Sequence, residues 1–174
     1  TTKPFFATIL TASNHEPYAL PASFEKKYAE APLNTTAYAD QCIGVFLEQA
    51  RSRKWFDSTI FILVADHGFR TGKNYYELEL SYQHIPILFY APQIIKPAVM
   101  DNLMGQIDIF PTLMGLMQMG YTNNTLGIDI LTQPRDCIYF SADDKIGCID
   151  NQWLYIYKFS GGESLYAYRH NDTH

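Results

Sequence analysis

The strongest chemical signal in the sequence is the run Asp66, His67 and Gly68, which directly follows the apolar residues 60–65. In open α/β sheets, ligands gather where strands end and side chains on a rigid strand project into a crevice. A carboxylate beside an imidazole suits Zn²⁺ or Mn²⁺, which accept mixed oxygen and nitrogen ligands. Neighbouring residues of a straight strand point to opposite faces, so we expect a bend here, which Gly68 permits. The alternative is that Asp66 only turns the chain and His67 is an ordinary loop residue.

Two further histidines are weaker candidates. His15 lies in the loop Asn-His-Glu-Pro after the apolar residues 5–10. An imidazole there could hydrogen-bond a phosphate or sulfate oxygen, or protonate a leaving alkoxide; the alternative is a surface histidine. Glu16 is a conceivable metal ligand, although the proline beside it more simply marks a turn. His84 precedes another apolar run, and it either lines the same crevice or only marks the entrance of a strand.

Two stretches carry apolar residues at helical spacing. The first begins at Asn34 or Thr35, either of which can cap a helix. Its apolar stripe consists of Ala39, Cys42, Ile43, Phe46 and Ala50. The second follows Asp108 and ends at Gly120. A capping role in this helix accounts for the carboxylate of Asp108 without a catalytic role. The carboxylate of Asp40 is likewise accounted for by the positive end of the dipole of the first helix.

Short apolar runs predict the strands. Residues 5–10, 59–65 and 85–90 each fit a strand, and the second run lacks polar alternation, so we expect it to be central and covered on both faces. Beyond residue 135, short runs separated by Asp-Asp and Gly-Gly predict antiparallel hairpins. The order of elements indicates a three-layer α/β core over residues 1–135 with a small antiparallel sheet over residues 136–174.

Composition and charge exclude several classes of protein. The 174 residues suffice for one compact domain, and 47% hydrophobic with 18% charged residues excludes a disordered tail or a coiled coil. A net charge of −5 without a Lys/Arg run argues against nucleic acid as a partner. No apolar run approaches the ~18 residues of a membrane span. Because the chain opens with Thr and enters an apolar run at once, we expect a fragment of a longer protein.

The three cysteines are too few for a disulfide scaffold and lack the spacing of a zinc or redox motif. Cys137 and Cys148 both lie in the strand-rich tail, so a bond between them is possible, but the sequence leaves it open.

Five blocks of the sequence, in order, resemble the sulfatase-like branch of the alkaline phosphatase superfamily. Within the first block, the run Ser-Asn-His-Glu-Pro is most similar to the lipoteichoic acid synthase and phosphoglycerol transferase group. The tail from Trp153 to Tyr166 is similar to the terminal sheet of the family, so the resemblance covers almost the whole chain. The five blocks are residues 4–18, 38–47, 59–68, 84–87 and 106–113.

The resemblance implies roles for specific positions. Asp66 and His67 match the metal-binding pair of the family, and His15 matches a histidine that contacts the substrate phosphate in the synthase group. The implied cofactor is a divalent metal: Mn, Zn or Mg. A Thr, Ser or formylglycine nucleophile and another acidic ligand come, in these enzymes, from the part of the domain that precedes this chain. No segment here matches the nucleophile motif, so we expect this C-terminal part of the catalytic domain to be inactive alone.

The function implied by the resemblance is that of a metal-dependent phosphoglycerol-type transferase. It would act at the extracytoplasmic face of the membrane on a glycerophosphate-bearing lipid or glycan, held there by N-terminal helices outside this chain. One alternative is a sulfatase that hydrolyses sulfate esters, and another is a noncatalytic domain on the same scaffold. The upstream nucleophile, Thr for transfer or formylglycine for sulfate hydrolysis, would separate the two enzymes.

Overall fold

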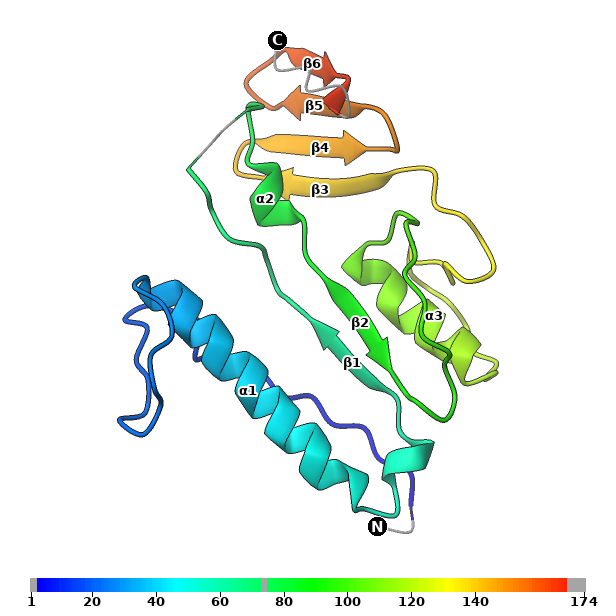
Figure 1. The fold of residues 1–174 in the computed structure, drawn as a ribbon. Helices are drawn as coiled ribbons and strands as arrows, with labels where there is room; N and C mark the ends of the chain where they lie inside the picture. Colours follow the sequence, from blue (N-terminus) through cyan, green and yellow to red (C-terminus); the bar gives the residue numbers. More distant parts are fainter. Residues whose placement is uncertain (1–2, 73–74, 169–174) are drawn as a thin grey trace. The chain divides into compact units, whose positions relative to one another are not determined.

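The computed structural model describes residues 3–72 and 75–168, and its contacts divide the chain into two compact units (Figure 1). The first unit comprises residues 1–62 and 89–97, and the second comprises residues 63–88 and 98–174. In chain order the elements are α1 (Ala31–Arg51), η1 (Phe56–Ser58), β1 (Phe61–Val64), α2 (Leu80–Gln83), β2 (Ile87–Tyr90), η2 (Gln106–Asp108), α3 (Ile109–Leu116), β3 (Ile138–Ala142), β4 (Lys145–Ile149), β5 (Leu154–Lys158) and β6 (Glu163–Tyr166).

Helix α1 confirms the first predicted helix but begins earlier, at Ala31, with a proline in its first turn. Proline is tolerated there because its missing N–H would have no partner within the helix. The predicted apolar stripe is only partly covered, since Ala50 is buried whereas Cys42 and Phe46 are exposed. The ring of Phe46 meets that of Phe61 edge-on, with centroids 6.1 Å apart.

Asn34 does not cap α1 but fixes the loop that precedes it. Its buried side-chain oxygen accepts hydrogen bonds from the backbone N–H groups of Lys27 and Tyr28, at 2.7 and 3.0 Å. Its amide nitrogen donates to the carbonyls of Tyr28 and Glu30, at 2.7 and 3.0 Å. All four hydrogen-bonding positions of the amide are therefore used, which explains how it is buried without cost from unpaired polar atoms.

The strand predicted over residues 5–10 is absent from the structure. These residues are irregular, and the side chains of Phe6 and Leu10 are 88% and 89% exposed. A strand persists only where a neighbour exchanges backbone hydrogen bonds with it, and the described residues provide no such neighbour here. The apolar run was therefore insufficient to form a buried strand.

Strands β1 and β2 confirm the other two predicted strands and pair in a two-stranded sheet. Strand β2 begins directly after Pro86, as expected for a residue without a backbone N–H. The expectation that the first of these strands is central and covered on both faces is wrong for the described part of the chain. There, β2 is its one neighbour, and Val64 is exposed.

The tail forms the predicted antiparallel sheet, in the order β3-β4-β5-β6 (Figure 1, yellow to red). Each strand pairs with the next along the chain. The β3–β4 turn uses a residue with positive φ, Asp143, and the β5–β6 turn uses two, Gly161 and Gly162. Residues 169–174 of the predicted appendage lie outside the described residues.

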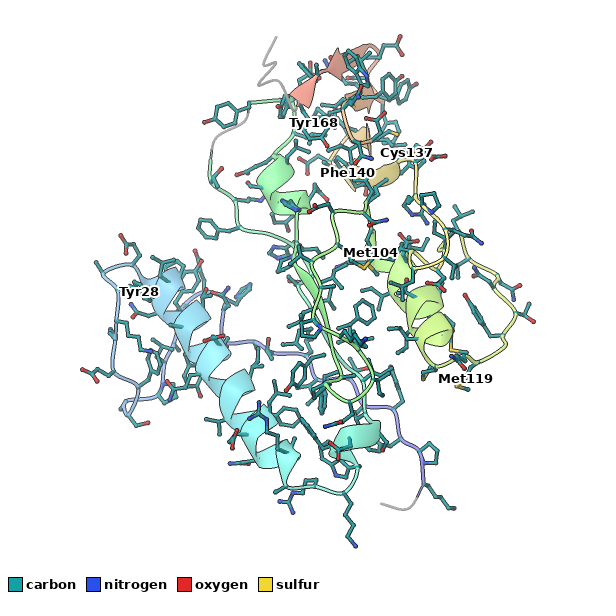
Figure 2. The ribbon with its side chains drawn as sticks, turned by 45° about the vertical axis from the view of Figure 1, so that its right-hand side comes forward. Tyr28, Met104, Met119, Cys137, Phe140 and Tyr168 are labelled. Atoms are coloured by element: carbon teal, nitrogen blue, oxygen red, sulfur yellow. The ribbon has the colours of Figure 1, made fainter. Side chains whose placement is uncertain are left out.

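One face of this sheet holds a hydrophobic core. Leu154 and Ile156 of β5 are fully buried, and they pack with Leu78 from the segment that precedes α2. Partly buried residues, including Phe140 and Tyr168 (Figure 2), pack against this core. Burial of a Leu or Ile side chain stabilises a fold by ~1.5–3 kcal/mol, so these two residues anchor the sheet.

Asp108 directly precedes α3, as predicted, but its side chain makes no capping hydrogen bond to that helix, so the predicted capping role is wrong. Its fully buried carboxylate forms a two-pronged ion pair with Arg135, in which the Arg135 Nε donates at 2.7 Å. It also accepts hydrogen bonds from the backbone N–H groups of Gly105 and Ile128, both at 2.9 Å. The carboxylate thus ties the start of α3 to the connection that leads into the terminal sheet.

Cys137 and Cys148 are free thiols in the structure, so the possible disulfide is not formed. Burial and a hydrogen bond with Cys137 raise the pKa of the Cys148 thiol. The hydroxyl of Tyr139 takes part in the same cluster, where its hydrogen bond with Cys137 and the charge of Cys148 raise its pKa to about 12.

Candidate functional site

Asp66 and His67 lie just beyond the end of β1, where the chain bends at both residues. The bend turns the two side chains towards each other, so the His67 Nε2 and the Asp66 Oδ2 are 3.8 Å apart. The other carboxylate oxygen, Oδ1, accepts the backbone N–H of His67 at 2.9 Å. Both side chains are largely open to solvent, at 81% for Asp66 and 51% for His67.

The arrangement of these two side chains fits one divalent cation. The His67 Nδ1 donates to the carbonyl of Gly68 at 2.9 Å, which leaves the Nε2 lone pair available for a metal. Ligand bonds of about 2.0–2.2 Å let two donors on one ion lie roughly 3–4 Å apart, which includes the distance found here. The described residues contain no group of three or more His, Cys, Asp or Glu side chains suited to a metal. A complete site would therefore need donors beyond this pair.

Gly68 is required by a close approach of the backbone rather than by a special φ angle. Its N–H donates to the carbonyl of Tyr82 at 2.8 Å. A Cβ atom at this position would lie 2.0 Å from the carbonyl oxygen of Ser81 and 2.9 Å from that of His84. Because Gly68 has no side chain, its backbone can lie directly against α2 and against His84, which follows that helix. The sequence suggested the bend but not this contact.

Gln106 is a positioning residue that the sequence analysis did not single out. Its side-chain amide donates to the carbonyls of Ala65 and Asp66, at 2.8 and 3.2 Å. Residue 106 opens one of the five blocks of the family resemblance, which was the one available signal. The neighbouring ion pair of Asp108 holds η2 in place, so Gln106 fixes the backbone from which Asp66 and His67 project.

His84 does not join the pair as a third ligand in the described part of the chain. It follows the last residue of α2, and its N–H donates to the carbonyl of Leu80 at 2.9 Å. Its backbone oxygen contributes to the tight packing around Gly68. Its observed role is therefore structural.

His15 lies in the first unit, whereas Asp66 and His67 belong to the second. Its Nδ1 is 2.8 Å from the carbonyl of Glu16, so a proton on Nδ1 leaves Nε2 as an acceptor. The adjacent Asn14 is anchored to α1, because the fully buried hydroxyl of Thr35 donates to its side-chain oxygen at 2.8 Å. The hydrogen bonds of His15 and Asn14 thus hold this loop in place. Whether His15 shares a pocket with the pair remains a prediction.

The comparisons with known proteins agree on one family. A family model described as "Sulfatase" matches residues 1–119. Lipoteichoic acid synthase 1 of Bacillus subtilis is 25% identical over 95% of this chain, and this chain covers 29% of its length. Arylsulfatase K of Canis lupus familiaris is 25% identical over 68% of this chain, which covers 22% of its length. The chain therefore spans less than a third of these curated relatives.

A solved structure of a protein in the alkaline phosphatase superfamily from Vibrio parahaemolyticus has a similar fold. It is 28% identical, with a TM-score of 0.79 over 92% of this chain and 41% of its own. This likeness confirms the predicted fold class, an α/β core of the alkaline phosphatase type with a terminal antiparallel sheet. Across the described ranges, every helix is too short or too polar to cross a membrane.

Proposed function

Since the chain belongs to the sulfatase family, we propose that it forms part of a metal-dependent enzyme, and specifically of a phosphoglycerol-type transferase. The observation that carries this proposal is the convergence of the Asp66 carboxylate and the available Nε2 of His67 across 3.8 Å. Members of this family are hydrolases or transferases, so a paired oxygen and nitrogen donor at the end of a strand suits their chemistry.

The extent of the similarity favours transfer over sulfate hydrolysis. A match over 95% of the chain includes most of the terminal sheet, and it is with a lipoteichoic acid synthase. Two further synthase-related proteins of Bacillus subtilis match 83% and 76% of the chain, against 68% for arylsulfatase K. The likeness to a sulfatase of Formosa agariphila extends over 52%. We therefore rank a sulfatase second and a noncatalytic domain third.

Each candidate residue of this chain would have a separate role. Asp66 and the neutral imidazole of His67 would hold a Mn, Zn or Mg ion, with the Gly68 carbonyl keeping the imidazole in the correct tautomer. When bound, the ion would supply positive charge that lowers the pKa of a hydroxyl nucleophile and stabilises charge on the ester group. With both ring nitrogens protonated, His15 would donate a hydrogen bond from Nε2 to a phosphate oxygen of the substrate while Nδ1 stays on the Glu16 carbonyl. We propose that the nucleophile and the remaining metal ligands come from residues outside this chain.

The substrate would be a phosphoglycerol-bearing lipid or glycan at the extracytoplasmic face of the membrane. This placement follows the proposed synthase-like function, with any attachment to the membrane made by helices outside this chain. The net charge of −5 gives no basis for nucleic-acid binding.

Substitutions of the metal-binding pair test the proposal in the protein expressed from its complete gene. Asp66→Asn and His67→Ala should each lower phosphoglycerol transfer from a phosphatidylglycerol analogue by more than about 100-fold, because loss of an outer-shell partner alone costs up to about 100-fold. Mn²⁺ affinity, measured by calorimetry, should fall in parallel. Asp40→Asn, which changes an exposed carboxylate on α1, is the control. Full activity in both site variants would overturn the role of the Asp66–His67 pair. Turnover of neither ester by the unaltered protein would favour the noncatalytic alternative, and turnover of a nitrophenyl sulfate alone would favour the sulfatase.

A further inference from the structure

The side chain of Gln106 links η2 to the bend that carries the candidate metal-binding residues. Its amide nitrogen donates to the carbonyls of Ala65 and Asp66, at 2.8 and 3.2 Å. These carbonyls belong to the backbone from which the side chains of Asp66 and His67 project, and all four residues lie in the second unit. The position of this bend therefore depends on the position of η2.

Helix η2 is too short to hold its own conformation. It has three residues, Gln106–Asp108, and a helix of this length owes its stability to contacts outside itself. The Asp108 carboxylate closes the turn, because its Oδ2 accepts the N–H of Gly105 at 2.9 Å while the Asp108 N–H donates to the Gly105 carbonyl at 3.0 Å. The contacts of Asp108 thus decide where η2 lies.

Those contacts come from the connection between α3 and β3, residues 126–135 (Figure 1, yellow). Each oxygen of the Asp108 carboxylate accepts one hydrogen bond from the Arg135 guanidinium, whose side chain is only 16% exposed. The same guanidinium donates to the Leu126 carbonyl at 2.9 Å, and the Ile128 N–H donates to Asp108 Oδ1 at 2.9 Å. Arg135 therefore holds both ends of the connection against η2.

Gly127 brings the backbone of this connection directly onto η2. A Cβ atom at residue 127 would lie 2.1 Å from the carbonyl oxygen of Ile107 and 3.0 Å from the Pro111 Cγ. The two backbones leave no room for a side chain between them, which accounts for glycine at this position. A displacement of the connection must therefore displace η2 as well.

We propose that Arg135 is a positioning residue for the Asp66–His67 pair. It acts through Asp108, which holds η2, and through Gln106, which holds the bend. The proposal rests on the proposed function, because it takes a divalent metal as the ligand of that pair. Coupling between two sites is reciprocal, so metal binding should in turn stabilise residues 126–135.

Metal affinity tests the role of Arg135 in the protein expressed from its complete gene. Arg135→Gln should weaken Mn²⁺ binding, measured by calorimetry, by about 10-fold, at the low end of the range for residues that orient a metal ligand. Arg135→Lys keeps the charge but loses the two-pronged geometry, so it should restore only part of the affinity. The control is Lys158→Gln, which breaks the ion pair with Glu77 in the same unit and should change Mn²⁺ affinity by less than about twofold.

A double-mutant cycle separates positioning from general loss of stability. Gln106→Leu removes the link to the bend and should weaken Mn²⁺ binding about as much as Arg135→Gln does. Because both residues act through the same series of contacts, the double variant should bind Mn²⁺ no more weakly than the weaker single variant. Independent effects would instead multiply. Circular dichroism at the titration temperature identifies any variant that does not fold.

Hydrogen exchange in the unaltered protein tests the reciprocal effect without any substitution. Mn²⁺ should slow exchange of the Ile128 and Gly105 N–H groups by about 10-fold, matching the loss of affinity in Arg135→Gln. The paired N–H groups of β5 in the terminal sheet, Leu154–Lys158, should be unaffected.

Three outcomes would each overturn the inference and leave the proposed function intact: unchanged Mn²⁺ affinity in a folded Arg135→Gln variant, multiplied losses in the double variant, or unchanged exchange at Ile128. If the unaltered protein does not bind Mn²⁺, or if Asp66→Asn binds it equally well, the proposed function fails and the inference falls with it.

Discussion

The terminal sheet and the leading segment of the chain are both rich in apolar residues, yet they differ in burial. In the sheet, Leu154 and Ile156 have no exposed surface. In residues 5–10, Phe6 and Leu10 are almost fully exposed. The difference lies in the hydrogen-bonding partners, since each strand of the sheet pairs with the next strand along the chain, and the leading segment has no pairing strand among the described residues. An apolar run thus needs a neighbouring strand before it can form a core.

The largest expected effect comes from a matched pair of leucines in these two regions. Leu154→Ala removes a fully buried side chain and should lower the free energy of unfolding by ~2–5 kcal/mol. Leu10→Ala removes an exposed one and should change it by less than ~0.5 kcal/mol. Urea unfolding followed by tryptophan fluorescence measures both. Equal losses for the two variants would mean that residues 5–10 are buried in solution.

Two glycines give the next largest contrast. A Cβ at Gly147 in β4 would lie 2.4 Å from the ring of Phe140, so Gly147→Ala should destabilise the sheet by ~1–3 kcal/mol. Gly44 in α1 has no atom within 4 Å of such a Cβ, so Gly44→Ala should stabilise the helix by ~0.5–1 kcal/mol. Opposite shifts in thermal melting temperature are the expected result. A neutral Gly147→Ala would show that Phe140 can move aside freely.

A smaller effect is expected for Asn34, whose buried amide fixes the loop that precedes α1 in the first unit. Asn34→Ala leaves the N–H groups of Lys27 and Tyr28 without their acceptor and should cost ~1–2 kcal/mol. Amide hydrogen exchange should accelerate at those two residues, whereas Asn102→Ala, an exposed control, should leave them unchanged. Unaltered exchange in Asn34→Ala would indicate that the loop is held by other contacts.

The pH dependence of the terminal sheet should show a modest contribution from Glu77. The hydrogen bond from Lys158 lowers the pKa of the Glu77 carboxyl below its ordinary value of 4.5, and Ser164 also contributes. Because the folded-state pKa is depressed, the stabilisation is present above about pH 4.5 and is lost as the pH falls through the folded-state value. Glu77→Gln should therefore flatten the acid limb of a plot of melting temperature against pH. An unchanged acid limb would contradict this assignment.

The smallest effect concerns thiol reactivity and leaves stability unchanged. Burial raises the pKa of Cys148 in β4, whereas Cys42 lies exposed on α1. Since the thiolate is the reactive form, iodoacetamide at pH 8 should alkylate Cys42 well before Cys148. Peptide mass spectrometry over a time course gives the two rates. Faster reaction at Cys148 would mean that the sheet opens locally.

Local patterns explain which parts of the fold the sequence predicted. Helix α1 and the hairpins of the tail were confirmed because the hydrogen-bonding partners within them lie a few residues apart in the chain. The strand over residues 5–10 was wrong because apolar character says nothing about a distant partner. The role of Asp108 was underestimated for the same reason, since its partner Arg135 lies far along the chain.

The residues of the candidate site were likewise predictable only in part. Asp66 and His67 were found because they are adjacent and directly follow an apolar strand. Gln106 was missed because it acts through a backbone carbonyl, and no spacing rule marks such a contact. The candidate donors were therefore predictable from the sequence, whereas the side chain that holds their backbone was not.

The contact at Gly68 has a practical consequence for probing the site. Even a methyl group at Gly68 would collide with the Ser81 carbonyl. A cysteine or non-natural amino acid introduced there would displace α2, so its signal would reflect the distorted structure. Phe69, the next residue, has 65% of its surface exposed. A fluorophore or spin label attached at position 69 would test the proposed metal binding while leaving the packed backbone at Gly68 intact.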